Sequence, residues 1–586
     1  MAPGIFSGFI QSNEYKPLPF NSGRPSSPTP ISSPHRPKSI RSSRYVIGLV
    51  VFVPILALLL AIYPTHSELS NAYGNEWNGI VTKDGLERLA VPSQTNTTTG
   101  KRRLRIFMPA DSPHLNLCKT IMSAVALGYP LPTLLNWDGE FNRPHWHFAG
   151  SHIAKLTSLL AVIEELLDGT VDDGGAHEDD IALMIDAYDI WFQLPPQVLL
   201  DRFHKLNHDA DERNQKTWLD LSRFEDIPVP APQKQSIIVT SAKDCSPDWD
   251  SGSNPHYDYW PASPMPTDMY GAGTDHLAAP LWDPARKYRK IRPRCVNSGM
   301  IMGTMGAMRQ ALRRCKEKVE MIERSGRQLW SDQALFAEVI GEQEMFRTWV
   351  RGLAYTWNGT AALTDLSSLA PEVQRVAEEA MTGKQFDFGI GLDYSFATIP
   401  PTCSAEEDGS FIKLGDAGAV LQESLRAGVP GSARIGGPPS ALSQIPDVNN
   451  PLHNVSWGEV PLYTDFYFGT TPVGIHHNAY VMNLKPWRLK NWWDKMWFYP
   501  NLRSLVTKNL QMDSSERTLA HVSEVDDTLV DYGHASRIEN KVTIFHPSTE
   551  SRAASLIPVD WDGVCQKGNK PWHESLFGDG LGQLEI

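Results

Sequence analysis

The chain contains 586 residues, of which 41% are hydrophobic and 21% are charged, as is typical of a large globular protein. This composition excludes a wholly disordered chain, a collagen-like chain and a small scaffold held together by disulfides. The formal net charge of −13 argues against nucleic acid as the main partner, because binding to phosphates requires a basic surface.

One long apolar segment without a charged residue, 45–63, lies near the N-terminus. As a helix it would span about 28 Å, close to the roughly 30 Å hydrocarbon core of a bilayer. A buried core helix is the competing interpretation, and Pro54 slightly favours it. Residues 1–44 carry six Lys and Arg residues against one acid, so the positive-inside rule places them in the cytosol. We therefore expect a disordered cytosolic tail at 1–44, a single transmembrane helix at 45–63 and a lumenal body.

Two features of the sequence beyond this segment agree with a lumenal body. All six cysteines follow it, an even number that suits an oxidising compartment, although their pairing is left open. Three N-glycosylation sequons, at Asn96, Asn358 and Asn454, follow it as well. The sequence therefore predicts a type II membrane protein of the Golgi or the endoplasmic reticulum.

The predicted body alternates strands and helices. Residues 64–100 are polar and are expected to form a stem. Apolar runs and helical spacing then predict strands at 104–109, 131–137, 181–185 and 236–242 and helices at 114–128 and 153–167. Fully apolar strands that alternate with helices predict an α/β fold, with a mostly parallel sheet flanked by helices. We assign this domain to 101–500, with irregular insertions at 246–294 and 404–460 and a C-terminal extension at 501–586.

The strongest chemical signal lies where the apolar strand 181–185 ends. Asp186 and Asp189 follow it directly. Ligands of open α/β sheets bind beyond the carboxyl ends of strands, and two carboxylates there can hold a hard divalent cation. The alternative is that these acids only cap a loop.

The segment LMIDAYDIWFQLPPQVLLDRF resembles the metal-binding segment of the glycosyltransferase module of the collagen lysyl hydroxylases, which contains F-V-D-x-Y-D. Six further elements resemble that family in the same order. They are Lys155 at the start of a helix, SAKDC (241–245), CVNSGMIMG around 297–299, Ser331-Asp332-Gln333 followed by ALF, IGLDYSFATI (390–399) and GIHHNAY (474–480). The likeness covers roughly 104–480 and leaves out the tail, the stem and the last hundred or so residues.

This resemblance implies a GT-A fold and a metal-dependent transferase that uses a UDP-sugar. Asp186, Asp189 and His476 would ligate Mn²⁺ or Mg²⁺, which stabilises the charge of the departing diphosphate. A nitrogen ligand suits Mn²⁺ better than Ca²⁺. His477 lies beside His476 where the family has glycine, so the ring that points inward stays open. The family's dioxygenase domain has no counterpart here, and no hydroxylase activity is expected.

The resemblance also implies a set of nucleotide and sugar contacts. Lys155 would contact the nucleotide, and Tyr188 would stack on uracil; the alternatives are a solvated helix lysine and a core aromatic. Asn297 and Ser298 would line the donor pocket, or form a simple turn. Asp332 would lie near the acceptor or the sugar, as a base or as a hydrogen-bond partner of hydroxyls. Ser331 replaces the family's first acid of this pair.

Two functions are therefore weighed. The first is a metal-dependent glycosyltransferase that transfers a hexose from a UDP-sugar to a lumenal protein or glycan acceptor. The second is a catalytically inactive GT-A-like subunit that serves in binding or assembly. The basic-aromatic stretch 485–497 is expected to be a helix packed on the body, with acceptor binding or membrane contact as the alternatives.

Overall fold

The computed structural model describes Leu86, Leu89 and residues 101–585 with gaps. The gaps are 144, 147–149, 172–174, 218–232, 244, 246, 248–250, 272–290, 357–365, 403–408, 430–432, 453–454, 479–483, 513–517, 524–528, 536–539 and 567–570. The chain divides into two units, 1–80 and 81–586, and all described residues belong to the second.

The expected tail and membrane span lie outside the described residues, as do the three sequons. Within the described part, no helix has the length and apolar character needed to cross a bilayer. Of the expected stem, only Leu86 and Leu89 are described, and both are buried in an apolar cluster with residues of the body. These two leucines therefore belong to the folded body rather than to a solvated stem.

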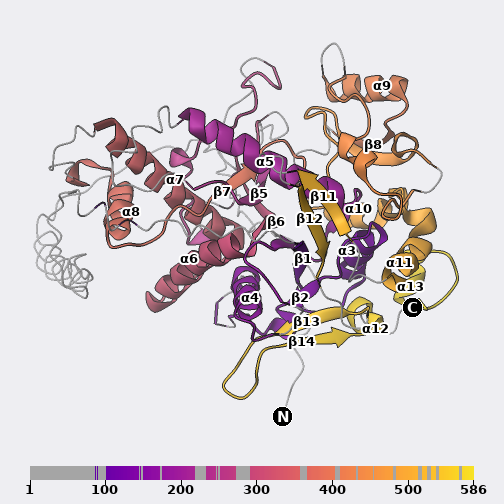
Figure 1. Ribbon diagram of the computed structural model, residues 1–586, viewed down its shortest axis with the longest axis horizontal. Helices are drawn as coiled ribbons and strands as arrows, with labels where there is room; N and C mark the ends of the chain where they lie inside the picture. Colours follow the sequence, from indigo (N-terminus) through magenta and orange to yellow (C-terminus); the bar gives the residue numbers. More distant parts are fainter. Residues whose placement is uncertain are drawn as a thin grey trace, which may run out of the picture. The chain divides into compact units, whose positions relative to one another are not determined.

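A ten-stranded sheet forms the centre of the body (Figure 1). Its main path runs through β14 (Ser555–Val559), β13 (Val542–His546), β2 (Thr133–Leu135), β1 (Arg102–Pro109), β3 (Ile181–Ile185), β6 (Cys295–Thr304), β5 (Ile237–Ala242) and β7 (Ile390–Asp393). β12 (Leu529–His534) pairs with the start of β1, and β11 (Thr518–Ser523) pairs with β12. Two small sheets join β10 (Gly474–His476) to β4 (Ile190–Phe192) and β8 (Gly409–Lys413) to β9 (Pro461–Asp465).

The strand directions bring the polar ends of the apolar strands to one edge. β1 pairs in parallel with β2, β3 and β12, and β5 pairs in parallel with β7. β6 runs antiparallel to both β3 and β5, so β3, β5 and β7 point the same way. The mixed α/β fold with a largely parallel sheet confirms the predicted fold class at that level.

Alternate side chains of the buried strands pack into two cores, one on each face of the sheet. In β3, Ile181, Leu183 and Ile185 join one core, and Ala182 and Met184 join the other. This is why the strand is apolar throughout. Helices cover both faces, as Figure 1 shows. They are α3 (Leu115–Ala126), α4 (Gly150–Leu167), α5 (Pro196–Thr217), α6 (Met305–Arg324), α7 (Asp332–Thr356), α8 (Pro371–Met381), α9 (Ala417–Ala427), α10 (Leu484–Asn491), α11 (Leu502–Gln511), α12 (Trp561–Cys565) and α13 (Trp572–Phe577).

A set of charges that is buried at its centre joins α6, α7 and α8, and we call it the helix cluster. Its members are Arg314, Lys318, Glu338, Glu342, Arg375 and Glu379. Glu342 is fully buried, and its two oxygens accept from Arg314 at 2.9 Å each. Lys318 also donates to Glu342, at 2.8 Å. These charges lie between helices, away from the carboxyl edge of the sheet.

The structure differs from the expected domain boundaries in two places. The segment 404–460, expected to be an irregular insertion, contains β8 and α9, and Leu414 and Val420 join the core. An acidic N-cap, Asp416, starts α9, and Gly428 ends it with a φ of 89°. The segment 501–586 is not a separate extension, because β12 and β13 pair with β1 and β2. Its strands are short, and their partners lie some 400 residues away, which hides them from local patterns.

Two disulfides are present among the described residues. Cys118 in α3 bonds Cys565 in α12, and Cys245 bonds Cys295 at the start of β6. Cys315 is free and buried. The even cysteine count therefore does not mean that every cysteine is paired.

Candidate metal centre

The short turn between β3 and β4 carries both candidate aspartates. Asp186 follows the last residue of β3, and Asp189 precedes the first residue of β4. Asp189 is 4% exposed, and Asp186 is half-buried. Two strand ends therefore fix the backbone on either side of the pair.

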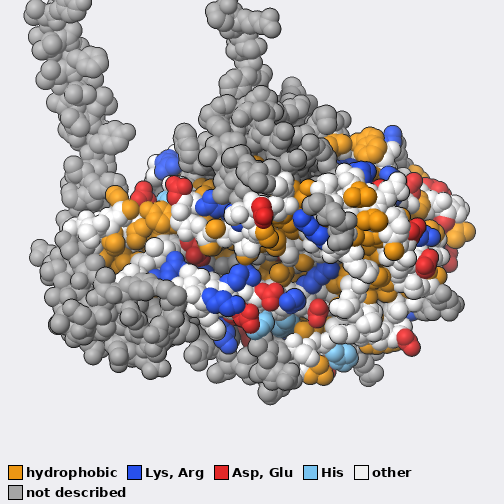
Figure 2. Space-filling model, turned by 90° about the horizontal axis from the view of Figure 1, so that it is seen from above, with side chains coloured by type: hydrophobic (Ala, Val, Ile, Leu, Met, Phe, Trp, Pro, Cys, Tyr) orange, Lys and Arg blue, Asp and Glu red, His pale blue; other side chains and the backbone are white. Residues whose placement is uncertain are grey.

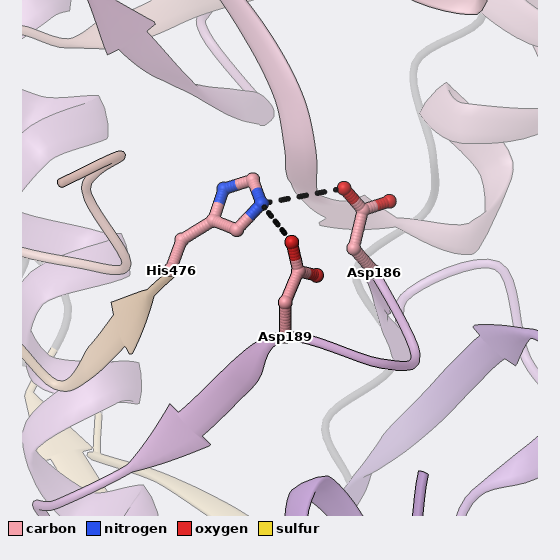
Figure 3. Close-up of side chains that lie close together, drawn as sticks. All are labelled: Asp186, Asp189 and His476. Atoms are coloured by element: carbon pink, nitrogen blue, oxygen red, sulfur yellow. Dashed lines mark ion pairs between the residues drawn. The ribbon is translucent and has the colours of Figure 1, made fainter. Parts of the chain in front are cut away.

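β10 brings His476 to the same point. It runs antiparallel to β4, with His476 opposite Ile190. The Nε2 atom of His476 lies 3.5 Å from an Asp186 oxygen and 3.3 Å from an Asp189 oxygen. Figure 3 shows the three side chains pointing toward one another, and one ligand atom from each lies within 4.8 Å of the others. The expected ligand set thus converges, although its residues are up to 290 positions apart in the sequence.

The turn after β7 supports the strand that carries His476. The Asp393 carboxylate accepts from the backbone and hydroxyl of Thr398, at 2.7 Å each. The Thr398 carbonyl in turn accepts from the backbone nitrogen of Gly474 at 3.2 Å. Thr402 donates its hydroxyl and its backbone N–H to the His476 carbonyl, at 2.8 and 3.0 Å. The IGLDYSFATI motif therefore has a structural role behind the site.

Two lysines flank the carboxylates. The Nζ atom of Lys155, in α4, lies 2.7 Å from Asp186 and 2.8 Å from Asp332. The Nζ atom of Lys485, in α10, lies 2.8 Å from Asp189. Lys155 is 8% exposed, so it is not the solvated helix lysine of the alternative interpretation.

These contacts perturb the titration of the buried groups. Burial alone would raise the pKa of Asp189, but the charge of Lys485 and the hydrogen-bonding contact with His476 outweigh it and hold the pKa well below its ordinary value. Burial would lower the pKa of Lys155, but Asp186 and Asp332 outweigh it and raise that pKa. Both groups therefore stay charged at neutral pH.

Asp332 stands at the first turn of α7 and faces the same cluster. Its Oδ2 atom accepts from the Ser298 hydroxyl at 2.8 Å. Burial would raise the pKa of Asp332, but the charge of Lys155 outweighs it and lowers the pKa. A carboxylate so held is a strong hydrogen-bond acceptor and a weak base.

Ser331 caps the helix that begins at Asp332. Its Oγ atom accepts from the backbone nitrogen of Ala334 at 3.1 Å, and the residue is 5% exposed. Serine is a favoured N-cap. Ser331 therefore has a structural role of its own as the cap of α7.

Asn297 and Ser298 lie at a bulge of β6. In the ladder with β5, Thr240 pairs with Asn297 while Val239 pairs with Ile301, so residues 298–300 bulge out. Ser298 turns its hydroxyl to Asp332, and Asn297 lies against His476, with Oδ1 and Nδ1 3.2 Å apart. The N-S-G sequence is thus part of a strand at the site rather than a simple turn.

Tyr188 lies between the two aspartates and holds the loop after β1. Its hydroxyl donates to the Asp111 carboxylate at 2.9 Å and lies 3.0 Å from the Ser112 carbonyl. Its ring packs against the core. Burial raises the pKa of Tyr188 well above its ordinary value, so the hydroxyl stays protonated.

His477 points away from the ligand set. It is fully buried, with its ring centroid 4.1 Å from that of Trp191 and 5.7 Å from that of Trp492. Burial lowers its pKa well below the ordinary value. This answers the question raised by the two adjacent histidines, because only His476 faces the aspartates.

Lys485 is the site residue that the sequence interpretation did not assign. It belongs to the basic-aromatic stretch 485–497, expected to be one packed helix. The α-helix α10 ends at Asn491, and the buried Trp493 and Trp497 lie beyond its end and pack in the core. The signal that would have found Lys485 is its closeness in sequence to His476, which it follows by nine residues.

Comparisons with known proteins offer no further guide to the site. Charged side chains of both signs lie interspersed on the face shown in Figure 2. No protein-family model and no curated protein matches this chain. The assignment of a function therefore depends on the geometry of the site.

Proposed function

We propose that this protein is a metal-dependent glycosyltransferase that transfers a hexose from a UDP-sugar to a protein or glycan acceptor in the lumen of the Golgi or endoplasmic reticulum. The observation that carries the proposal is the convergence of Asp186, Asp189 and His476 at the carboxyl edge of the sheet. This is the edge at which α/β folds bind ligands.

The chemistry of the donor atoms fits a divalent cation. Asp186 and Asp189 offer oxygens, and His476 offers one imidazole nitrogen. Oxygen ligands suit Mg²⁺ and Mn²⁺ alike, and the nitrogen favours Mn²⁺. When bound, such an ion acts as a Lewis acid for the oxygens of a diphosphate.

The charge balance of the site favours an anionic substrate once a cation is present. Asp186, Asp189 and Asp332 bring three negative charges against the positive charges of Lys155 and Lys485. A divalent cation changes this excess of one negative charge into an excess of one positive charge. A nucleoside diphosphate ester is the kind of donor that such a site attracts.

The remaining residues have roles in binding and orientation. Lys155 and Lys485 supply cations beside the metal ligands, where they would attract the phosphates. Asp332 offers an acceptor oxygen for sugar hydroxyls, while Tyr188 fixes the loop at Asp111 and Ser112, next to the ligand aspartates. The acidic pKa of Asp332 supports hydrogen bonding to the sugar over the role of a base.

The test is a donor panel with the full-length protein purified in detergent. UDP release from UDP-glucose, UDP-galactose and other UDP-sugars would be measured with Mn²⁺ and with EDTA. We expect release from one donor, loss of it with EDTA, and a drop of about 10³-fold or more in Asp189→Asn. Asp209→Asn, at an exposed pair with Lys205 in α5, is the matched control and should stay active.

Two outcomes would contradict the proposal in different ways. Mn²⁺-dependent binding of UDP without turnover of any donor would identify the inactive GT-A-like subunit. Absence of both turnover and Mn²⁺-dependent UDP binding would show that the site does not bind a UDP-sugar.

A further inference from the structure

Asn297 contacts the side of the His476 ring that faces away from the ligand aspartates. Its Oδ1 atom lies 3.2 Å from Nδ1 of His476 and 3.2 Å from the backbone nitrogen of Gly299. Asn297 is 8% exposed and His476 is 2% exposed, so water competes little for these bonds. The contact joins β6 to β10 across 179 residues of sequence.

The backbone of Gly299 fixes which way the Asn297 amide is turned. A backbone N–H only donates, so the Asn297 atom that faces it is the carbonyl oxygen. The same oxygen faces Nδ1 of His476, and this ring nitrogen must therefore carry the proton. In the neutral imidazole, the form that binds a metal, Nε2 then keeps its lone pair, which faces the oxygens of Asp186 and Asp189 at 3.5 and 3.3 Å. Three acceptor atoms face one point, an arrangement that a cation stabilises.

The same short segment also fixes the position of the ring and of one aspartate. A Cβ atom at position 299 would overlap Cε1 and Nδ1 of His476, so the ring fits only against glycine. The Gly299 carbonyl accepts from the backbone nitrogen of Asp186 at 2.9 Å. The Thr240 hydroxyl donates to the backbone carbonyl of Asn297 at 2.8 Å and holds the bulge in place.

We infer that Asn297 is a positioning residue that sets the tautomer and orientation of His476, and through them the affinity of the site for Mn²⁺ and its preference for Mn²⁺ over Mg²⁺. The inference rests on the proposed metal-dependent function. It gives Asn297 a task different from contact with the donor sugar. Partners of this kind, on the far nitrogen of a ligating histidine, change metal affinity by about 10–100-fold.

The experiment measures metal binding by the full-length protein without nucleotide. Free Mn²⁺ is quantified by electron paramagnetic resonance, and Mg²⁺ affinity by competition. For Asn297→Leu we expect a Mn²⁺ dissociation constant about 10–100-fold higher and a smaller preference over Mg²⁺. Asn297→Asp keeps the acceptor oxygen and should stay within about threefold of the wild type.

Two controls separate positioning from a general loss of structure. Asn509→Leu removes another buried asparagine, which donates to the Ala126 carbonyl in the body, and should leave Mn²⁺ binding unchanged. Electron spin-echo modulation should show nitrogen coupling to bound Mn²⁺ in the wild type and Asn297→Asp. The coupling should be absent in His476→Ala. If Asn297→Leu does not fold, Asn297→Ser decides, because its hydroxyl is too short to reach the ring.

The outcomes also separate this inference from the proposed function. Wild-type Mn²⁺ affinity and unchanged nitrogen coupling in a folded Asn297→Leu or Asn297→Ser variant would overturn the role of Asn297 alone. Failure of the wild type to bind Mn²⁺ would overturn the proposed function and the inference together.

Discussion

Two clusters of charged side chains with buried centres differ in how their hydrogen-bond donors and acceptors are arranged. In the helix cluster, each Glu342 oxygen receives N–H donors from surrounding cations, so donors and acceptors alternate. At the carboxyl edge of the sheet, two carboxylates and an imidazole nitrogen converge on one point instead. Buried charge therefore does not by itself mark a functional site. The convergence of acceptor atoms is what makes the second cluster a candidate metal site.

The comparison is tested most strongly by removing the charge at the centre of the helix cluster. Glu342→Gln leaves Arg314 and Lys318 buried without their main counter-charge. We expect the free energy of unfolding to fall by about 3–5 kcal/mol, measured by urea denaturation. Mn²⁺ affinity of the folded variant should stay as in the wild type. A change in that affinity would show that the two clusters are coupled.

The same carboxyl group predicts how stability depends on pH. Burial would raise the pKa of Glu342, but Lys318 and Arg314 outweigh it and hold the pKa well below its ordinary value. The unfolded chain then binds a proton at a higher pH than the folded one. The stability that the ionised Glu342 contributes is complete above about pH 5 and is lost as the pH falls through 4 toward the pKa of the folded state. Urea midpoints from pH 7 to 3 should fall less steeply in Glu342→Gln, and an equal slope would contradict the assignment.

Lysine substitutions in the two clusters sharpen the comparison. Lys155→Met removes a cation shared by Asp186 and Asp332, and we expect a loss of about 1.5–3 kcal/mol in stability. Mn²⁺ should restore part of this loss, because a metal ion also neutralises Asp186. Lys318→Met is the matched control in the helix cluster and should gain nothing from Mn²⁺. Equal recovery of both variants would mean that the metal acts elsewhere.

The smallest expected effect on stability is that of Ser331, which caps the N-terminus of α7 next to the site. Ser331→Ala removes the hydroxyl that accepts from Ala334 and should cost about 1 kcal/mol of stability. Thr304→Ala removes the corresponding cap of α6 and gives a comparison without a contact to the site. If Ser331→Ala lowered donor turnover far more than this loss explains, Ser331 would act in the site and not only as a cap.

Local sequence patterns predicted those parts of the fold in which a buried apolar strand is followed directly by the polar residues of a motif. The run 181–185 and the acids after it predicted both β3 and its place at the ligand-binding edge. The end of that strand pointed to Asp186 and Asp189 as candidate metal ligands, and the resemblance added His476. The structure brings the three together without testing the metal. Lys155 and Asp332 also lie at this point.

Other parts depend on contacts that no local pattern contains. The pairing of β12 and β13 with β1 and β2 is decided by packing across the whole chain. Lys485 lies in a stretch that its tryptophans mark as core, and only the folded chain shows that its ammonium lies 2.8 Å from Asp189. The choice between His476 and His477 likewise depends on the pocket between Trp191 and Trp492.

The order of synthesis gives the pairing of β1 with β12 a further meaning. Among the described residues, β1 is the first strand to leave the ribosome, yet its β12 neighbour comes from residues 529–534. Until that segment has been synthesised, the first residues of β1 have no strand to pair with on that side, and chaperones protect unpaired strand edges of this kind. A nascent chain cut short before residue 529 would therefore keep the β2 and β3 neighbours of β1 but lack the β12 neighbour of its first residues, and quality control would meet an open sheet edge rather than a shortened tail.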